Sequence, residues 1–423
     1  MSYAEFMPER FPRWALVHYE MDPTEVTDVA EEVRKAFAAA PDVIKPGHRV
    51  CLTGGSRGID RIDLVLKAAV AEVKARGAVP FIIPAMGSHG GATAEGQLEV
   101  LESYGITPET MGCEIRSSME TVELGQVEEG VPVFMDKTAY EGADVIIPIN
   151  RVKPHTDFHG PVESGLMKMI AIGLGKQKGA DTFHGQGFAV FHRLIPAVGR
   201  YTLSKVNIPF GLALVENAHA RLSFIEAVPA DRMWEREQEL LRIARDRMAR
   251  LPVAAVDVLV LDYIGKDISG LGMDSNVVGR YYTGPTGMGP DVQRIVVRDL
   301  TPATEGNAVG IGMADVVLSQ AVTKMDQHKT YMNCITAKTP EGARVALTVD
   351  TDREALAVAL ACCLKVRPAD AKVIRLKDTK HLERFYASES LLPELLATGR
   401  CEIIEPLHDI RFDASDMLLD KEV

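Results

Sequence analysis

Short apolar runs and segments with helical periodicity alternate along the first part of the chain. Residues 49–55 and 78–87 are apolar runs that end in glycine. Residues 60–77 and 93–105 carry apolar residues at intervals of three and four, and Thr93 stands where a helix N-cap belongs. We therefore predict two strands, each followed by a helix. Repeated βα units favour a mainly parallel sheet covered by helices on both faces.

Two further apolar runs, at 143–150 and 206–217, are also predicted to be strands. A long amphipathic segment at 232–252 ends at a proline and predicts a helix. We place a domain boundary after this helix, which gives domains of residues 1–252 and 253–423. A chain of 423 residues is long enough for two such domains.

The same alternation returns in the second half of the chain, with apolar runs that predict strands and periodic segments that predict helices. The predicted strands are 256–265, 343–350 and 371–378, and the predicted helices are 313–325 and 352–366. The predicted fold class is therefore α/β, with two α/β domains built on mainly parallel sheets.

Composition and charge narrow the class of protein. The formal net charge of −12 argues against a nucleic-acid partner, which requires a basic surface. We find neither a signal peptide nor an apolar run long enough to span a membrane, so we expect a cytoplasmic protein. The six cysteines form no CxxC pair, which favours free thiols over disulfides or an iron–sulfur cluster.

Candidate chemistry gathers where the predicted strands end. Ligands of open α/β sheets bind beyond the carboxyl ends of the strands. The first end leads into residues 53–57, the second carries His89, and the third carries His155 and His159. Three histidines, with glycines and cations, at one edge of a sheet predict a functional site.

The third of these loops continues into the most unusual stretch of the chain, residues 150–188. Lys168 lies there within an apolar, glycine-rich segment, and His184 follows. Desolvation would lower the pKa of Lys168 and make its amine nucleophilic. The alternative is that its side chain reaches solvent. The segment 173–179, GLGKQKG, lacks the glycine and the Ser or Thr of a P-loop.

A short-chain dehydrogenase is one alternative, because TGGSRGID (53–60) and the pair Tyr201 and Lys205 are similar to that family's motifs. Asp60 stands where the dinucleotide loop needs a glycine for close helix packing. The strand at 78–87 also lacks the acid that would bind a ribose hydroxyl. We therefore reject this interpretation.

A second resemblance fits more of the chain. AMGSHGGATAEGQ (85–97) resembles the Gly-Thr/Ser-His loop of the nickel-pincer lactate racemases, the nickel-dependent 2-hydroxy-acid racemase and epimerase superfamily. HGPVESGLMK (159–168) is similar to that family's His-to-Lys segment, and His184 follows Lys168 at the family's spacing. GGSR (54–57) stands in place of the family's Asp-x-Thr-Arg loop. These motifs occur in the family's order over most of residues 50–190.

The resemblance implies an active site in the cleft between the two domains and a nickel pyridinium-3,5-bisthiocarboxylic acid mononucleotide as cofactor. Lys168 would tether it and His184 would bind nickel, to which imidazole is suited. The residues implied to cradle its phosphate are Gly87, Ser88, Gly90 and Thr93.

The implied reaction is racemisation or epimerisation of a 2-hydroxy acid by reversible hydride transfer, which makes the protein an isomerase. His89 and His159 would be the paired general bases, and His155 competes with His159 for the second role. Arg57 would hold the substrate carboxylate. Enzymes of cofactor synthesis are the implied partners, and a homodimer is compatible with the family.

The sequence departs from the family at Gly54, which replaces an acid, and in the spacing from His159 to Lys168, which is one residue short. GLGMDSN (270–276) resembles a family substrate loop, but the expected Gln and Lys do not follow it. A hydroxy acid other than lactate is therefore favoured. Its candidate contacts, against the alternative of a solvated loop, are Lys266, Asp267 and Arg280.

Two other functions stay open at this point. One is a binding protein that kept the fold and lost the cofactor. The other is a hydrolase that uses the histidines to hold a different metal ion.

Overall fold

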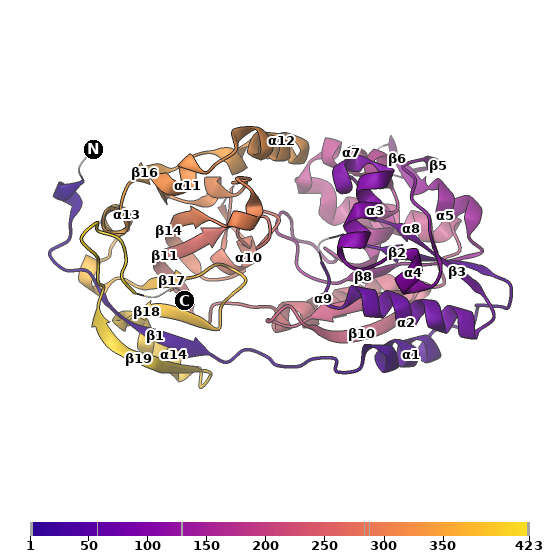
Figure 1. Ribbon diagram of the computed structural model, residues 1–423, viewed down its shortest axis with the longest axis horizontal. Coiled ribbons are helices and arrows are strands. Elements are labelled where there is room, and N and C mark those ends of the chain that lie inside the picture. The colour runs from indigo at the N-terminus through magenta and orange to yellow at the C-terminus, as the bar shows by residue number, and fades with distance from the viewer. Residues whose placement is uncertain (1–2, 57, 128–129, 283, 287, 421–423) are drawn as a thin grey trace. The chain divides into compact units, whose positions relative to one another are not determined.

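The computed structural model describes residues 3–56, 58–127, 130–282, 284–286 and 288–420. The chain divides into two compact units (Figure 1). Unit 1 comprises Met1–Met21 and Ala249–Val423, and unit 2 comprises Asp22–Met248. The sequence-based division at residue 252 assigned the first 21 residues to the other domain.

Unit 2 is built on a four-stranded parallel sheet with the order β4-β3-β2-β7. A second sheet has the order β10-β9-β8, in which β8 and β9 are parallel, and β5 pairs with β6 in a hairpin. The strands are β2 (Arg49–Gly54), β3 (Val79–Pro84), β4 (Glu114–Ile115), β5 (Thr121–Val127), β6 (Val131–Asp136), β7 (Val145–Ile147), β8 (Ile149–Arg151), β9 (Phe210–Glu216) and β10 (Leu222–Pro229).

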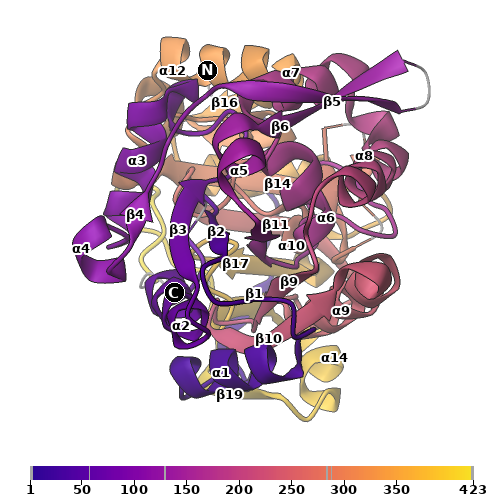
Figure 2. The same cartoon turned by 90° about the vertical axis from the view of Figure 1, so that its right-hand side faces the viewer.

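Helices cover both faces of these sheets. Alternation along β2 sends Cys51 into one core and Leu52 into the other. In Figure 2, α1 and α2 lie on one side of β2 and β3, and α5 and α8 lie on the other. The helices of unit 2 are α1 (Val29–Ala39), α2 (Ile62–Ala75), α3 (Ala94–Ser103), α4 (Pro108–Met111), α5 (Lys137–Gly142), α6 (Leu166–Lys168), α7 (Lys176–Gln186), α8 (Phe191–Lys205) and α9 (Met233–Arg247).

The single strand predicted at 143–150 is two strands, β7 and β8, which belong to different sheets. Pro148 lies between them and has no N–H to donate to a ladder. The buried Thr53 hydroxyl accepts the Ile149 N–H at 2.9 Å and thereby ties β2 to the start of β8. The third predicted loop therefore follows β8 of the three-stranded sheet. The start of β8 still lies next to β2.

Unit 1 contains an eight-stranded sheet with the order β16-β15-β14-β11-β17-β18-β1-β19. The first five strands are parallel, and the last three are antiparallel to their neighbours. They are β1 (Arg13–Tyr19), β11 (Ala255–Ile264), β14 (Asp291–Leu300), β15 (Val316–Leu318), β16 (Leu347–Val349), β17 (Val373–Leu376), β18 (Arg384–Ser388) and β19 (Cys401–Asp409). Pairing of β1 with β18 and β19 is what places the N-terminal residues in this unit.

The helix predicted at 313–325 is wrong in its first half. Val316–Leu318 is the fully buried strand β15, and a helix begins only at Ser319. Three adjacent apolar residues fit a strand buried on both faces as well as they fit a buried helix, so periodicity could not separate the two. The helices of unit 1 are α10 (Ser275–Val278), α11 (Ser319–Thr323), α12 (Gln327–Ala337), α13 (Asp352–Ala361) and α14 (Leu392–Ala397).

Both units are therefore α/β, with helices and strands interleaved and with mainly parallel sheets, as the sequence predicts. Among the described helices, none combines the length and the apolar character that a membrane crossing requires.

Candidate functional site

Two of the predicted loops of unit 2 contact each other directly. The Ser56 hydroxyl, after β2, is hydrogen-bonded to Nδ1 of His89, after β3. Gly55 packs against Met169, because a Cβ built on Gly55 would lie 3.3 Å from the Met169 methyl carbon. Lys168 directly precedes this methionine. The first two loops and the lysine segment thus meet at the carboxyl ends of β2 and β3.

The His89 loop has a backbone that requires glycine. Gly87 and Gly90 have φ of +60° and +66°, and a Cβ on Gly90 would lie 2.6 Å from the backbone of Gly96. The Thr93 side chain accepts the Gly96 N–H at 3.0 Å, so the predicted N-cap of α3 is confirmed. The predicted phosphate contacts, Ser88 included, therefore lie on a tight turn that enters a helix.

Glu163 organises both histidines of the third loop. Its carboxylate is fully buried and accepts the His155 N–H at 2.6 Å and the Gly160 N–H at 3.1 Å. His159 Nδ1 lies 3.3 Å from the same carboxylate, and Arg245 of α9 donates to it at 2.6 Å. Burial alone would raise the pKa of Glu163. The hydrogen bonds from His159, His155 and Gly160 outweigh burial and lower that pKa below its ordinary value.

The hydrogen-bond partners assign different tautomers to the two histidines. An ionised carboxylate only accepts, so Nδ1 of His159 carries the proton and Nε2 keeps its lone pair as an acceptor. Nδ1 of His155 lies 3.3 Å from the Asp157 carboxylate but accepts the Asp157 N–H at 3.0 Å, and this shorter bond from an obligate donor places the proton on Nε2. The His159 side chain, 33% exposed, can therefore take a proton at Nε2, whereas neutral His155 can only donate there.

Lys168, His155 and His184 converge on one aromatic cluster, formed by Phe158, Phe188 and Phe191. The Lys168 ammonium lies 6.0 Å from the Phe158 ring centroid, and the His155 ring lies 4.5 Å from it. The His184 ring lies 5.5 Å from Phe188 and 5.8 Å from Phe191. Phe158 and Phe191 are themselves 5.4 Å apart, so the cluster is continuous.

The start of the helical segment that carries Lys168 is held by a buried acid that the sequence analysis did not single out. Glu237 of α9 is fully buried and accepts the Met167 N–H at 2.9 Å. Its other oxygen has no hydrogen-bond partner among the described residues. Burial raises the pKa of Glu237 to about 7, against the lowering effect of the Met167 and Leu166 N–H groups. The available signal was the position of this acid on the apolar stripe of α9, between Met233 and Leu241.

Substitution of Glu237 by glutamine should change how stability depends on pH. Folded Glu237 keeps a proton that the unfolded chain releases between pH 4.5 and about 7, so the free energy of unfolding falls as pH rises through this window. The shift corresponds to about 3 kcal/mol. Denaturant titrations should show Glu237→Gln gaining about 2 to 3 kcal/mol relative to the natural protein between pH 5 and pH 8. The exposed Glu235→Gln on the same helix is the control. A stability difference that is the same at both pH values would refute the assignment.

The lysine segment also contains a residue that sequence reasoning set aside. Lys176 is fully buried, whereas Lys168 is partly exposed. Burial lowers the pKa of Lys176, although Asp136 acts in the opposite direction. The predicted desolvated lysine is therefore present in this segment, but at Lys176.

Arg57, the predicted carboxylate ligand, lies outside the described residues. In unit 1, Lys266 donates to the Gly270 carbonyl at 2.7 Å and to Asn333 at 3.1 Å, and Asp267 accepts from Thr301 at 2.5 Å. Both side chains thus stabilise the loop after β11, and a substrate contact by either stays a prediction.

Arg280 is held more firmly within its own unit. It forms an ion pair with Asp315. Its other acceptors are the carbonyl oxygens of Val292 at 2.9 Å, Gln293 at 2.7 Å and Met313 at 3.2 Å. These bonds give Arg280 a structural role, because they tie its loop to β14. The sequence suggested either a substrate contact or a solvated loop, and did not predict this role.

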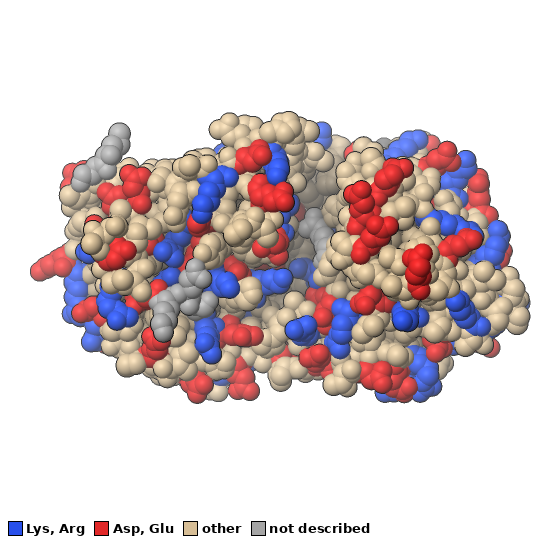
Figure 3. All heavy atoms as spheres, in the orientation of Figure 1, with Lys and Arg blue, Asp and Glu red and all other residues tan. Residues whose placement is uncertain are grey.

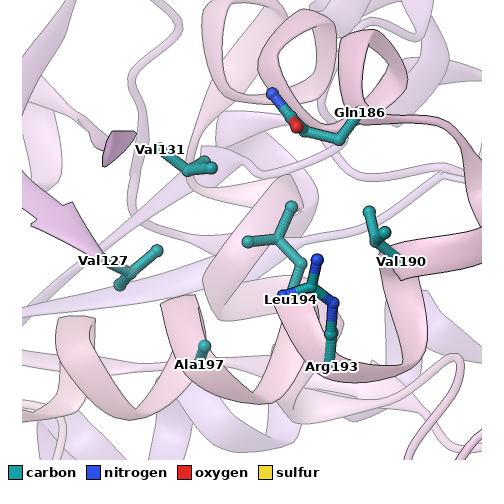
Figure 4. A pocket seen from close by; sticks show the side chains of 7 residues that line it. All are labelled: Val127, Val131, Gln186, Val190, Arg193, Leu194 and Ala197. Carbon is teal, nitrogen blue, oxygen red and sulfur yellow. The ribbon is translucent and has the colours of Figure 1, made fainter. Parts of the chain in front are cut away.

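A small apolar depression lies between α8 and the β5–β6 hairpin (Figure 4). Its lining residues are Val127, Val131, Gln186, Val190, Arg193, Leu194 and Ala197. Its volume of about 40 Å³ holds a water molecule, whereas small-molecule sites span roughly 300–1,000 Å³. A mononucleotide therefore does not fit this depression.

The surface charge follows the composition. On the face shown in Figure 3, the described acidic and basic side chains are interspersed, with a row of acids over α3. Glu95, Glu99 and Glu102 are the exposed acids of that helix. This face carries no basic stripe among the described residues of the kind that a nucleic-acid backbone requires.

Comparison with known proteins gives a likeness in fold. No protein-family model matches the sequence, and no curated protein matches it. A solved protein from Thermotoga maritima is similar, with a TM-score of 0.50 and 16% identity over 80% of this chain and 91% of that chain. The lactate racemase apoprotein from Thermoanaerobacterium thermosaccharolyticum gives a TM-score of 0.45 and 13% identity over 90% of this chain and 87% of that chain. At 16% identity, the Thermotoga likeness concerns the fold alone.

Proposed function

We propose that this chain is a racemase or epimerase of a 2-hydroxy acid and that unit 2 binds a nickel-pincer mononucleotide. The observation that carries the proposal is the convergence of Lys168 and His184 on the cluster of Phe158, Phe188 and Phe191. The sequence motifs implied an amine to tether the cofactor and an imidazole to bind its metal. Both side chains reach this cluster, as does His155.

The donor set fits such a cofactor. Lys168 would tether the cofactor and His184 would bind its nickel ion, to which imidazole is suited. Among the described residues, no group of three or more His, Cys, Asp or Glu side chains is placed to hold a metal ion.

The glycine turn before α3 fits the nucleotide phosphate. The left-handed backbone at Gly87 and Gly90 lets the chain turn tightly into the N-terminus of a ten-residue helix. The positive end of the helix dipole and the N–H groups of its first turn favour an anion. The turn also carries His89, which would place phosphate recognition and a catalytic base on one loop.

When bound, the cofactor supplies a reversible hydride acceptor for the α-carbon of the substrate. The residues of the chain then have to move the hydroxyl proton. His159 can accept this proton at Nε2, because its Nδ1–H is held by Glu163. His89 can do the same for the opposite enantiomer when its Nδ1–H donates to Ser56.

His155 takes a different role in this proposal. Its Nε2–H can donate a hydrogen bond but cannot accept a proton, because Nδ1 is occupied by the Asp157 N–H. We therefore assign the second base to His159 and an orienting contact to His155. Arg57 remains the proposed ligand of the substrate carboxylate.

Racemisation in deuterated water tests the reaction. Protein co-expressed with the cofactor pathway is incubated with single enantiomers of 2-hydroxy acids and of sugar acids. Chiral chromatography should show inversion, and mass spectrometry should find no deuterium at the α-carbon, because a transferred hydride does not exchange with solvent. Deuterium gained at each inversion would contradict hydride transfer. Protein expressed without the pathway is the control.

A further inference from the structure

Three fully buried polar side chains lie next to the His89 loop, and one of them, Lys176, contacts the other two. Lys176 Nζ lies 3.0 Å from Asp136 Oδ2, 3.2 Å from Gln97 Oε1 and 2.6 Å from the Pro84 carbonyl oxygen. Gln97, Asp136 and Lys176 are each 0% exposed. They come from α3, the end of β6 and the start of α7, so the contact joins three elements around the carboxyl end of β3.

Lys176 sets the orientation of the Gln97 amide. An ammonium group only donates, so the amide must present Oε1 to it. Nε2 then points the other way and donates to the Gly87 carbonyl at 2.9 Å and to the His89 carbonyl at 3.2 Å. A flipped amide would place NH₂ against the ammonium and Oε1 against two carbonyl oxygens, which leaves every contact unsatisfied.

Burial of the Asp136–Lys176 pair costs folding free energy. An ammonium and a carboxylate at 0% exposure lose their hydration, and apolar residues of similar volume often replace such a pair without loss of stability. Lys176 also adopts a left-handed backbone with φ of +54°, which is uncommon for a residue with a side chain. The contacts of Gln97 with both carbonyl groups of the His89 turn identify what the pair can support.

We propose that Asp136, Lys176 and Gln97 form a positioning relay that fixes the His89 turn and thereby directs the His89 imidazole toward Ser56. Asp136 holds the lysine, the lysine orients the amide, and the amide holds the two carbonyl groups on either side of Ser88. That His89 moves a proton rests on the proposed function. The orientation of the His89 ring by the relay is independent of the proposed function.

Two substitutions separate positioning from stability. The double variant Asp136→Asn, Lys176→Met removes both buried charges, and asparagine can still cap α5, where the Asp136 side chain accepts the Ala139 N–H at 2.8 Å. Gln97→Glu keeps an acceptor for Lys176 but has no N–H for the two carbonyl groups. The exposed Lys178→Met, two residues further along α7, is the matched control.

Nitrogen-15 NMR of the histidine side chains gives the first readout, with His89 identified by its absence in His89→Gln. In the natural protein, the fixed turn should hold the His89 ring against Ser56 and give one tautomer, with Nδ1 either donating to the hydroxyl or accepting from it. We expect the double variant to stay folded, and both it and Gln97→Glu to show an averaged His89 signal. Lys178→Met should match the natural protein. A single fixed His89 tautomer in folded double variant and in Gln97→Glu would overturn the proposal.

Kinetics and intact mass give the second readout. With the cofactor loaded, both relay variants should lose about 10- to 100-fold in kcat with KM within about twofold, as expected for a displaced catalytic group. The mass adduct on Lys168 should be unchanged. If the natural protein carries no adduct and racemises nothing, the proposed function fails, and the NMR result still decides the relay. An unchanged kcat in folded, loaded variants would overturn the relay alone.

Discussion

Replacement of Lys168 by alanine should reduce racemisation to the uncatalysed background. Lys168 is the only covalent attachment point that the proposal gives the cofactor, and its loss should remove the hydride acceptor together with the nickel ion. Because enzymes typically accelerate reactions by about 10⁶-fold or more, the fall in kcat/KM should be limited only by the sensitivity of the assay. Chiral chromatography of a racemised hydroxy acid measures it directly.

Two further variants sharpen this prediction. Lys178→Ala removes an exposed lysine ten residues further along and should leave the rate unchanged. His184→Ala should keep the mass adduct on Lys168 but lose nickel and activity, because the tether and the metal ligand are different side chains. Racemisation by Lys168→Ala at more than a few per cent of the natural rate would contradict the assignment of the tether.

His159→Gln should lower kcat by about 10²- to 10⁴-fold, the usual contribution of a general base. His155→Gln should cost only about tenfold, the value of one hydrogen bond of roughly 1.4 kcal/mol. The difference follows from the tautomers: Glu163 holds Nδ1–H of His159, and the Asp157 N–H occupies Nδ1 of His155. Glutamine retains hydrogen-bonding capacity in both variants, so each substitution tests mainly the proton transfer.

The order of the two effects is the informative result. A larger loss in His155→Gln than in His159→Gln would reverse the assignment of the second base. Glu163→Gln should resemble His159→Gln, because an amide oxygen can accept the Nδ1–H but does not stabilise the imidazolium that forms. A readout independent of activity is the His159 tautomer by nitrogen-15 NMR, which Glu163→Gln should retain, so that the fall in kcat reports the missing charge and not a lost orientation.

Local sequence patterns predicted the helix cap and the strands that interactions between neighbouring residues determine. Thr93 was recognisable as a cap because its hydroxyl satisfies an N–H three residues ahead, and the helix begins where expected. The strands at β2 and β3 were recognisable as apolar runs ending in glycine. The predicted meeting of the loops after them also follows, because adjacent parallel strands end at the same edge of a sheet.

The features of the fold and the site that were not predicted depend on contacts between residues that are distant in sequence. Membership of β1 in unit 1 is set by pairing with β18 and β19, more than 360 positions away, and no local pattern encodes it. Glu237 and Gln97 looked like ordinary helix polar residues, yet each lies on the buried side of its helix and serves a loop elsewhere. Lys176 was set aside because its segment lacks the P-loop motif. A lysine within an apolar, glycine-rich segment was nevertheless a signal of a buried charge.

The histidine assignment shows the same limit. The sequence placed His155 and His159 on one loop and left the choice of base open. The choice depends on which ring nitrogen meets an acceptor, and that is set by Glu163 and the Asp157 N–H. Periodicity and composition carry no information about such a contact.

Intact-mass analysis of the natural protein, co-expressed with the enzymes of cofactor synthesis, decides whether Lys168 carries a nickel-pincer mononucleotide. We expect a mononucleotide-sized adduct on the peptide that contains Lys168, together with about one nickel ion per chain by elemental analysis. Unmodified chain without nickel, from cells in which a known pincer enzyme is loaded, would contradict it.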